Sequence, residues 1–252
     1  MRQSPGLAIV ACAFGLAAYA VGLVITLPAS FIDAGLERTS RGIVRLADAQ
    51  GSLWSGSGQL EFREKGVRIG NPHHLAWHFQ PWSLLRGHLA FEVELDQATR
   101  RAILTAGLSR VELSNADIVL PAAVLGLAEP KLAPFKLGGE LSLHIPRLAV
   151  GRQQIEGKAV LQWRGATSAL TTVAPLGDYE LNIAGSGTMI EVVMQTLQGP
   201  LQIDGKGAWT SGGNAAFTAN ARIPPPLRQQ LAPLLGLIAV ERSAGNFEIQ
   251  LK

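Results

Sequence analysis

The sequence has 252 residues, with 22 Lys and Arg against 19 Asp and Glu and a formal net charge of +3. Charged residues make up 16% of the chain, against about 25% in typical soluble domains, and a single Cys excludes an intramolecular disulfide framework. The Lys and Arg are scattered without interleaved aromatic residues. The composition therefore gives no support to a nucleic-acid-binding groove, and no nucleic acid is expected among the partners.

An uncharged, apolar run of 21 residues occupies positions 7–27, LAIVACAFGLAAYAVGLVITL. A helix of this length spans about 30 Å, the hydrocarbon thickness of a bilayer. We therefore expect a single transmembrane anchor at 7–27, preceded by a short cytoplasmic tail at 1–6. The only Cys, Cys12, lies inside this run and leaves no thiol for catalysis in the remainder of the chain.

A cleaved signal peptide is the alternative to an anchor, because Ala18-Tyr19-Ala20 fits a small-x-small cleavage site. Signal peptides have apolar runs of about 7 to 15 residues, so the longer run here favours an uncleaved anchor. The Arg residues on the two sides of the run do not decide its orientation. Long downstream domains translocate largely regardless of charge, and a strand-rich remainder suits the bacterial periplasm.

A short stalk is expected next, at 28–42, with a helix that begins near Pro28. Ile32 and Leu36 lie one helical turn apart and share a face. From Ile43 the apolar residues alternate with a period of two, which is typical of strands. Residues 43–252 are therefore expected to form a mainly β periplasmic domain, an extended and mostly antiparallel sheet with a few short helices.

Alternating apolar and polar residues, bounded by turn residues, predict the strands of this domain. Between 88 and 95, for example, Leu89 and Phe91 point to one face, and Glu92 and Glu94 point to the other, toward solvent. The segment 99–107 is expected to be a short helix or an irregular crossover, and 121–127 to form one or two helical turns. The other predicted strands are 43–48, 59–63, 67–70, 75–79, 110–113, 117–120, 140–145, 154–163, 178–183, 189–194, 200–209, 215–223 and 247–251.

The β domain has two possible halves, 43–135 and 136–252, with a similar order of strands and Trp residues. The stretch from Gly87 that follows Trp77 is matched by the stretch from Gly177 that follows Trp163. A duplicated β-meander and a chance repetition of strand patterns both account for this similarity.

A Leu-rich helix is predicted after Pro224-Pro225-Pro226, where the sheet is interrupted. Its apolar positions recur at helical spacing, and Pro233 is expected to kink or split it. The helix either plugs the end of the sheet or docks on a partner or a membrane surface. The plug is favoured, because Arg228 is the only cation on the polar face and anionic lipid needs more. The apolar stripe consists of Leu227, Leu231, Leu234, Leu235 and Ile238.

The stretch Gly51-Ser52-Leu53-Trp54-Ser55-Gly56 follows the first predicted strand of the domain. Its glycines permit tight backbone bends, and Trp54 offers a large surface to bury. We therefore expect a hairpin corner in which Trp54 is buried.

This stretch, with Gly51, Leu53, Trp54 and Gly56, resembles the Gly-x-Leu-Trp-x-Gly motif of type II secretion system protein N. A later segment matches the family's pattern of a Trp, then a Pro, then Leu-Leu-x-Gly. A single anchor before the first motif and a Leu-rich helix before a closing strand also fit the family. The matching residues of the later segment are Trp77, Pro81, Leu84, Leu85 and Gly87.

The resemblance implies a non-enzymatic subunit of the bacterial machinery that exports folded proteins. Such a subunit is anchored in the inner membrane by a single pass, with the bulk of its chain in the periplasm, and acts by protein–protein contacts. Its expected partners are other inner-membrane or periplasmic subunits of the machinery and, through the anchor, the lipid bilayer. The sequence leaves open a periplasmic lipid-binding or lipid-transfer protein, in which an apolar groove of a curved sheet shields acyl chains.

The motifs of catalysis are absent from the sequence, with no G-x-S-x-G elbow, phosphate-binding loop or H-E-x-x-H pair. The one cluster of potential metal ligands is His73-His74-x-x-x-His78, in which His74 and His78 share a strand face. A structural zinc site takes four ligands, and no carboxylate or Cys accompanies this cluster. We therefore expect no catalytic residue, metal or cofactor, and a membrane-anchored hydrolase is the least favoured alternative.

Overall fold

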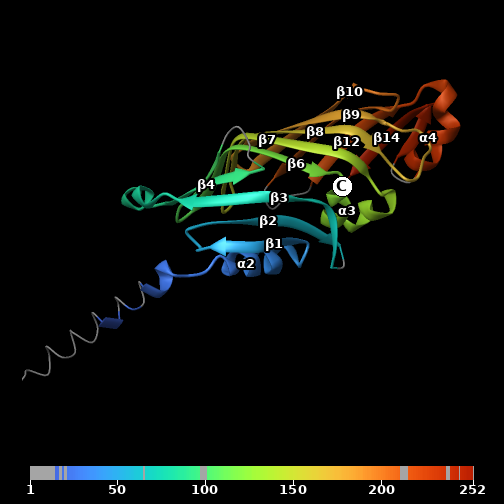
Figure 1. Ribbon diagram of the computed structural model, residues 1–252. Coiled ribbons are helices and arrows are strands. Elements are labelled where there is room, and N and C mark those ends of the chain that lie inside the picture. Colours follow the sequence, from blue (N-terminus) through green and yellow to red (C-terminus); the bar gives the residue numbers. More distant parts are fainter. Residues whose placement is uncertain are drawn as a thin grey trace, which may run out of the picture. The chain divides into compact units, whose positions relative to one another are not determined.

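The computed structural model describes residues 15–16, 19, 22–64, 66–96, 101–210, 215–236, 239–243 and 245–251. The chain divides into two compact units, Met1–Phe79 and Gln80–Lys252 (Figure 1). Both units consist mainly of strands, and the strand pairs within each are antiparallel. The predicted mainly β fold with few short helices is thereby confirmed. The duplication into halves at 43–135 and 136–252 stays a prediction.

Most of the anchor predicted at 7–27 lies outside the described residues, so the anchor too stays a prediction. Residues 15–16, 19 and 22–25 are helical, and the large apolar side chains among them are exposed. Within the described part of the chain, none of the helices has the length and apolar character that a membrane crossing requires.

The first unit joins the helix α2 (Ser30–Ser40) to a meander of β1 (Val44–Gly51), β2 (Ser55–Glu64) and β3 (Val67–Phe79). The two segments predicted as separate strands at 67–70 and 75–79 are one continuous strand, β3. Its ladder with β2 shifts register between Leu60 and Phe62, and the strand passes through Pro72 there. A β-bulge of this kind lets a Pro lie inside a long strand.

The second unit is a sheet in which strands that follow each other along the chain lie next to each other. The exception is at the end, where the last strand lies between the two strands that precede it in the chain. The order across the sheet is β4-β5-β6-β7-β8-β9-β10-β11-β12-β14-β13. The strands are β4 (Leu89–Leu95), β5 (Ala102–Ala106), β6 (Arg110–Pro121), β7 (Gly138–Gly151), β8 (Ile155–Thr167), β9 (Gly177–Ser186), β10 (Met189–Gln198), β11 (Gln202–Thr210), β12 (Ala215–Arg222), β13 (Val240–Ser243) and β14 (Asn246–Leu251).

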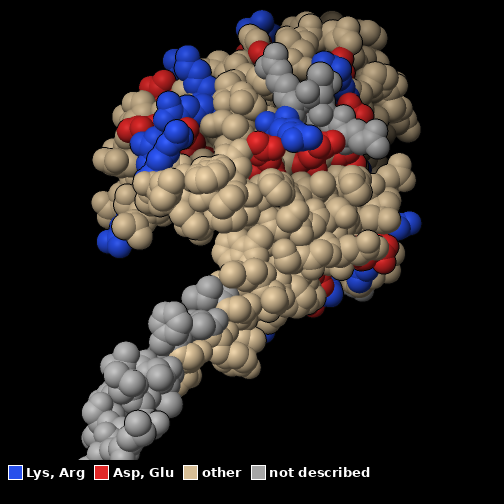
Figure 2. Space-filling model, turned by 60° about the vertical axis from the view of Figure 1, so that its left-hand side comes forward, with Lys and Arg blue, Asp and Glu red and all other residues tan. Residues whose placement is uncertain are grey.

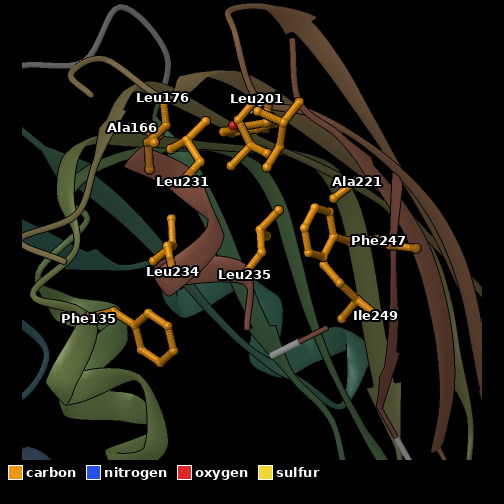
Figure 3. Packing of buried hydrophobic residues seen from close by; sticks show 13 residues of the cluster. Phe135, Ala166, Leu176, Leu201, Ala221, Leu231, Leu234, Leu235, Phe247 and Ile249 are labelled. Atoms are coloured by element: carbon orange, nitrogen blue, oxygen red, sulfur yellow. Dashed lines mark hydrogen bonds between the residues drawn. The ribbon is translucent and has the colours of Figure 1, made fainter. Parts of the chain in front are cut away.

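Short helices connect these strands. They are η1 (Pro81–Arg86), α3 (Val124–Ala128), η2 (Pro130–Phe135) and the pair η3 (Pro225–Leu227) and α4 (Arg228–Leu235). Figure 3 shows α4 inside the curve of the sheet, with Leu231, Leu234 and Leu235 packed toward the strands. The prediction that this helix plugs the sheet is confirmed, because all three leucines are buried in the main core cluster. Pro233 lies within α4, which runs through it.

Further elements differ from the sequence predictions. The two segments predicted as separate strands at 110–113 and 117–120 are one strand, β6. The segment 99–107 was expected to be a helix or crossover, yet Ala102–Ala106 forms strand β5, because β4 and β6 supply ladder partners on both sides. The short strand β13 was not predicted. All four of its residues are exposed, so it lacks the apolar alternation that marks a half-buried strand.

Candidate docking surfaces

The motif at 51–56 forms the turn between β1 and β2. Gly51 has a φ of +92°, in the left-handed region that favours glycine. A Cβ at Gly56 would lie 2.6 Å from the indole of Trp77, which is buried against this turn and donates from Nε1 to the Ser52 carbonyl at 3.2 Å. Both glycines are therefore required by the close approach of backbone and Trp77 at this corner.

The same turn binds the segment that leaves the N-terminal helix. The Leu53 N–H donates to the Leu27 carbonyl at 2.8 Å, and the Ala29 N–H donates to the Gly51 carbonyl at 3.2 Å. Pro28 and Ser52 form an isolated antiparallel bridge between these two bonds. The motif thus holds the chain at the point where the predicted anchor ends.

Trp54 is half-buried, so the prediction that it is buried in the corner is wrong. Its ring lies 5.0 Å from that of Phe79, and its Nε1 donates to the Val24 carbonyl at 2.8 Å. The polar edge of an indole needs an acceptor, and here the acceptor is the Val24 carbonyl near the end of a helix, which also accepts the Leu27 N–H at 3.4 Å. This position next to the helix end keeps part of the ring at the surface.

Apart from Trp77, which lies in β3 of the first unit, the later motif residues lie in the second unit, on and around η1. Pro81 begins η1, and Gly87 ends it with a φ of +75°. The buried Ser83 fixes the short helix, because its Oγ donates to the Gln80 carbonyl at 2.6 Å and accepts from the Ala90 N–H at 3.0 Å. The apolar side chains around Ser83 point outward, with exposed fractions of 78% for Trp82, 55% for Leu84 and 81% for Leu85. We call these three residues the η1 patch.

The sheet of the second unit has one mainly apolar side, which we call the concave face. Its side chains are those that the ladder registers place on the same side as Leu161 of β8. One row across five strands consists of Ile118, Leu143, Leu161, Leu181 and Met194, and the next consists of Ala116, Ile145, Ala159, Ile183 and Val192. A third row, nearer the turns at 107–110 and 151–154, includes Leu104, Leu113, Leu148 and Ile190.

The concave face is closed at one end and open at the other. At the closed end, α4 and η2 cover the face and leave an apolar cavity of about 160 Å³, whose walls include Trp163, Tyr179 and Ile203. Burial in this cavity wall raises the pKa of Tyr179, whose hydroxyl donates to the Leu201 carbonyl at 2.9 Å. The residues given above for the first and third rows are half-buried, whereas Ala116, Ile145, Ala159 and Val192 of the second row are buried and Ile183 alone is half-buried there.

The opposite face of this sheet is polar, and opposite charges pair across its strands. Glu112 binds both Arg110 and Arg147, which hold the pKa of that carboxyl below its usual range. Figure 2 shows the acidic and basic side chains lying side by side in mixed patches.

Strand β1 is paired on one side, with β2, and helix α2 occupies the donors on its other side. The Val44 N–H donates to Ser40 Oγ at 2.9 Å, and the Leu46 N–H donates to Asp33 Oδ1 at 2.8 Å. Asp33 also accepts two bonds from Arg45, which holds the pKa of its carboxyl low. Two of the outward donors of β1 that a partner strand would need, the Val44 and Leu46 N–H groups, are therefore already bonded within the first unit.

The histidines of β3 do not converge on one point. His74 and His78 share a face, but four residues of strand separate their Cα atoms by about 13 Å, too far for one metal ion. His73 lies on the other face, with its ring 6.2 Å from that of Phe62. Within the described part of the chain, no three His, Cys, Asp or Glu side chains lie close enough together to hold a metal ion.

Sequence reasoning located the motif residues but missed Trp82, which stands between two motif positions and is 78% exposed. The signal was present, because Trp-Ser-Leu-Leu after a Pro breaks the strand alternation and leaves apolar residues on successive positions. The particular residues of the concave face, Leu161 and Leu181 among them, were also missed as site residues, although their alternation was recognised.

Comparison with known proteins gives one match. A family model described as "Type II secretion system (T2SS), protein N" matches residues 43–250. No curated protein and no solved structure matches the chain.

Proposed function

Since this chain belongs to the type II secretion system protein N family, we propose that it is a non-enzymatic subunit of that machinery, anchored in the bacterial inner membrane. In this proposal residues 7–27 cross the membrane once and residues 43–252 stand in the periplasm. The subunit acts by binding another inner-membrane or periplasmic subunit. Its family membership supports the place in protein secretion, and the η1 patch supports the mode of action.

The exposure of the η1 patch is the observation that carries the proposal. Trp82 and Leu85 expose about four-fifths of their surface, and neither contributes to the core of its own unit. Burying an exposed Leu or Trp in a partner stabilises a complex by about 1.5 to 3 kcal/mol per side chain. Trp is also the residue type most enriched among the side chains that dominate binding energy.

The patch is presented by a rigid element. The two hydrogen bonds of Ser83 and the left-handed Gly87 fix the backbone of η1 in the free protein. A preformed surface loses less conformational entropy on binding than a mobile loop does. A protein partner with a complementary apolar pocket is therefore the ligand that this patch suits.

A secretion assay with substitutions in the patch tests the proposal. Leu85→Glu and Trp82→Ala should each reduce secretion at least about tenfold, because they remove a buried contact worth more than 1.4 kcal/mol. Leu108→Glu is the matched control, because Leu108 is a fully exposed leucine on the turn between β5 and β6. Thermal unfolding shows whether each variant is folded, and the amount of each variant in the membrane fraction shows whether it reaches the membrane.

A photo-crosslinking residue at position 85 should capture another subunit of the machinery in intact membranes. The same residue at position 108 should not. Equal secretion by the Leu85→Glu and Leu108→Glu proteins, with both folded and present in the membrane, would refute the η1 patch as the docking surface.

A further inference from the structure

We propose that the concave face of the second unit binds the acyl chains of a membrane phospholipid. This inference goes beyond the proposed function, which depends on the η1 patch on another element. It rests on four properties of the face: its chemistry, its partial exposure, its length and its closed apolar end.

The chemistry of the face fits a ligand that has no polar groups along its length. From β6 to β10 its central rows consist of aliphatic side chains and Gly. The hydroxyls on the face in these strands belong to Thr196 and Tyr179, and both are bonded to the backbone. Thr196 donates to and accepts from Ile203, at 2.9 and 2.6 Å, and Tyr179 donates to the Leu201 carbonyl at 2.9 Å. A peptide lying there would leave its own N–H and C=O groups without partners, which costs several kcal/mol. An acyl chain carries no such groups.

Part of the face is exposed, on either side of its buried second row. Leu143, Leu161 and Leu181 lie in the middle of the sheet, flanked by paired strands on both sides, yet all three are half-buried. By contrast, Leu231 and Leu235 at the closed end are completely buried. Covering the exposed part of the face with acyl chain is favourable at about 25 cal/mol per Å².

The face has the length that an acyl chain requires. On β8 it runs from Gly157 to Trp163, six residues of strand, which is about 20 Å. One leaflet of a bilayer has a hydrocarbon depth of about 15 Å. A phospholipid chain of ordinary length can therefore lie along the face with its headgroup in water at the open end, where Val111 and Val150 are exposed.

The closed end suits the methyl end of the chain. The cavity of about 160 Å³ beneath α4 is continuous with the row of Trp163 and Tyr179 on the face, and Leu234 and Leu235 form its other wall. Apolar cavities of about 150 Å³ stay dry and take up small apolar molecules. A membrane phospholipid is the source we infer, because the predicted anchor keeps the chain beside the bilayer.

The test uses the full chain in membranes that contain a phospholipid with a photoactivatable acyl chain. After illumination the protein is digested, and the labelled peptides are identified by mass spectrometry. The expected result is label on peptides from β6 to β10, separate from any label on residues 7–27 that contact the bilayer directly. Wild-type label confined to residues 7–27 would overturn the proposal, and this arm needs no variant.

A matched pair of variants locates the ligand on one face. Leu181→Gln places an amide on the concave face and should lower the label about tenfold, because the amide must be desolvated. Val193→Gln, one residue away from Met194 in the ladder of β9 and β10, places the same amide on the outer face and should leave the label unchanged. Equal labelling of the two folded proteins would overturn the proposal. Labelling of the face by a photoactivatable free fatty acid, without labelling by the phospholipid, would overturn it too.

The two proposals fail in different ways. The Leu85→Glu protein keeps its concave face, so it should keep wild-type phospholipid labelling even where secretion is lost. If its labelling fell with its secretion, the concave face would not be an independent lipid site and the inference would be withdrawn.

Discussion

The indole Nε1 of Trp54 donates a 2.8 Å hydrogen bond to the carbonyl oxygen of Val24, thirty residues earlier in the chain. This bond joins the first hairpin of the β fold to the end of the N-terminal helix. Together with the Leu53–Leu27 backbone bond, it attaches the Gly-Ser-Leu-Trp-Ser-Gly turn to the C-terminal end of the predicted anchor. The conformation of this motif thus serves attachment of the helix as well as packing of the turn.

Trp54→Phe separates the two roles of Trp54. The Phe ring can still pack against Phe79, but the bond to Val24 is lost, which should lower the free energy of unfolding of the first unit by about 1 kcal/mol. Trp54→Ala loses the ring contact too and should cost about 2 kcal/mol, less than the 3 to 5 kcal/mol of a fully buried Trp. Denaturant titration of the full chain measures both values. An equal loss for the two variants would show that the hydrogen bond alone matters.

Gly56→Ala should be strongly destabilising, by about 2 kcal/mol or more. The added Cβ would lie 2.6 Å from the Trp77 ring, and that ring is buried and cannot move aside without disturbing the core. Gly35→Ala is the control, because nothing lies within 4 Å of a Cβ there and Gly35 is inside helix α2. There Ala should be neutral or stabilising by up to about 1 kcal/mol. The midpoint of thermal unfolding should therefore fall for Gly56→Ala, and it should stay unchanged or rise for Gly35→Ala.

The stability of the first unit should fall in acid through Glu61. This side chain is buried beside Arg63 and Arg68, with its Oε2 2.7 Å from Arg63, and the bond to Arg63 holds the pKa of Glu61 below its usual range. A carboxyl whose pKa is lower in the folded state contributes stability above its unfolded pKa, about 4.3, and loses that contribution as the pH falls through the folded pKa.

The measurement is the free energy of unfolding between pH 3 and pH 7. The wild-type value should be flat above about pH 5 and fall below about pH 4. Glu61→Gln should reduce the steepness of this fall, because one proton fewer is taken up on unfolding. Identical slopes for the two proteins would show that Glu61 does not contribute to the acid sensitivity.

Much of the fold follows from local patterns. Period-two alternation predicted the faces of β4, β7 and β8, and helical spacing predicted α4 with Leu231 and Leu235 buried. The sequence failed where long-range pairing decides the structure. Ala102–Ala106 is a strand because of its two neighbours, and Trp54 is half-buried because a carbonyl thirty residues away accepts its N–H.

The positions of the docking surfaces could be predicted from the sequence, but their exposure could not. The Pro81 to Gly87 motif was visible in the sequence, whereas the outward direction of Leu85 depends on how the buried Ser83 fixes η1. The alternation of β8 likewise places Leu161 on an apolar face. Whether that face is covered depends on how far α4 extends across it, which is a property of the assembled sheet.

The edge of β1 gives the last prediction, which concerns self-association. Asp33 Oδ1 accepts the bond from the Leu46 N–H, on the side of β1 that faces away from β2. Asp33→Ala leaves this donor free, which should cost about 1 to 2 kcal/mol and expose a strand edge that can pair with a second copy. Glu37→Ala is the matched control on the same helix. It removes an exposed contact with Arg45 at 3.0 Å and leaves the β1 donors bonded, so it should cost less than about 0.5 kcal/mol. Light scattering of the detergent-solubilised full chains should show larger species for Asp33→Ala alone, increasing with protein concentration. If both variants keep the size of the wild type, then helix α2 does not protect this edge.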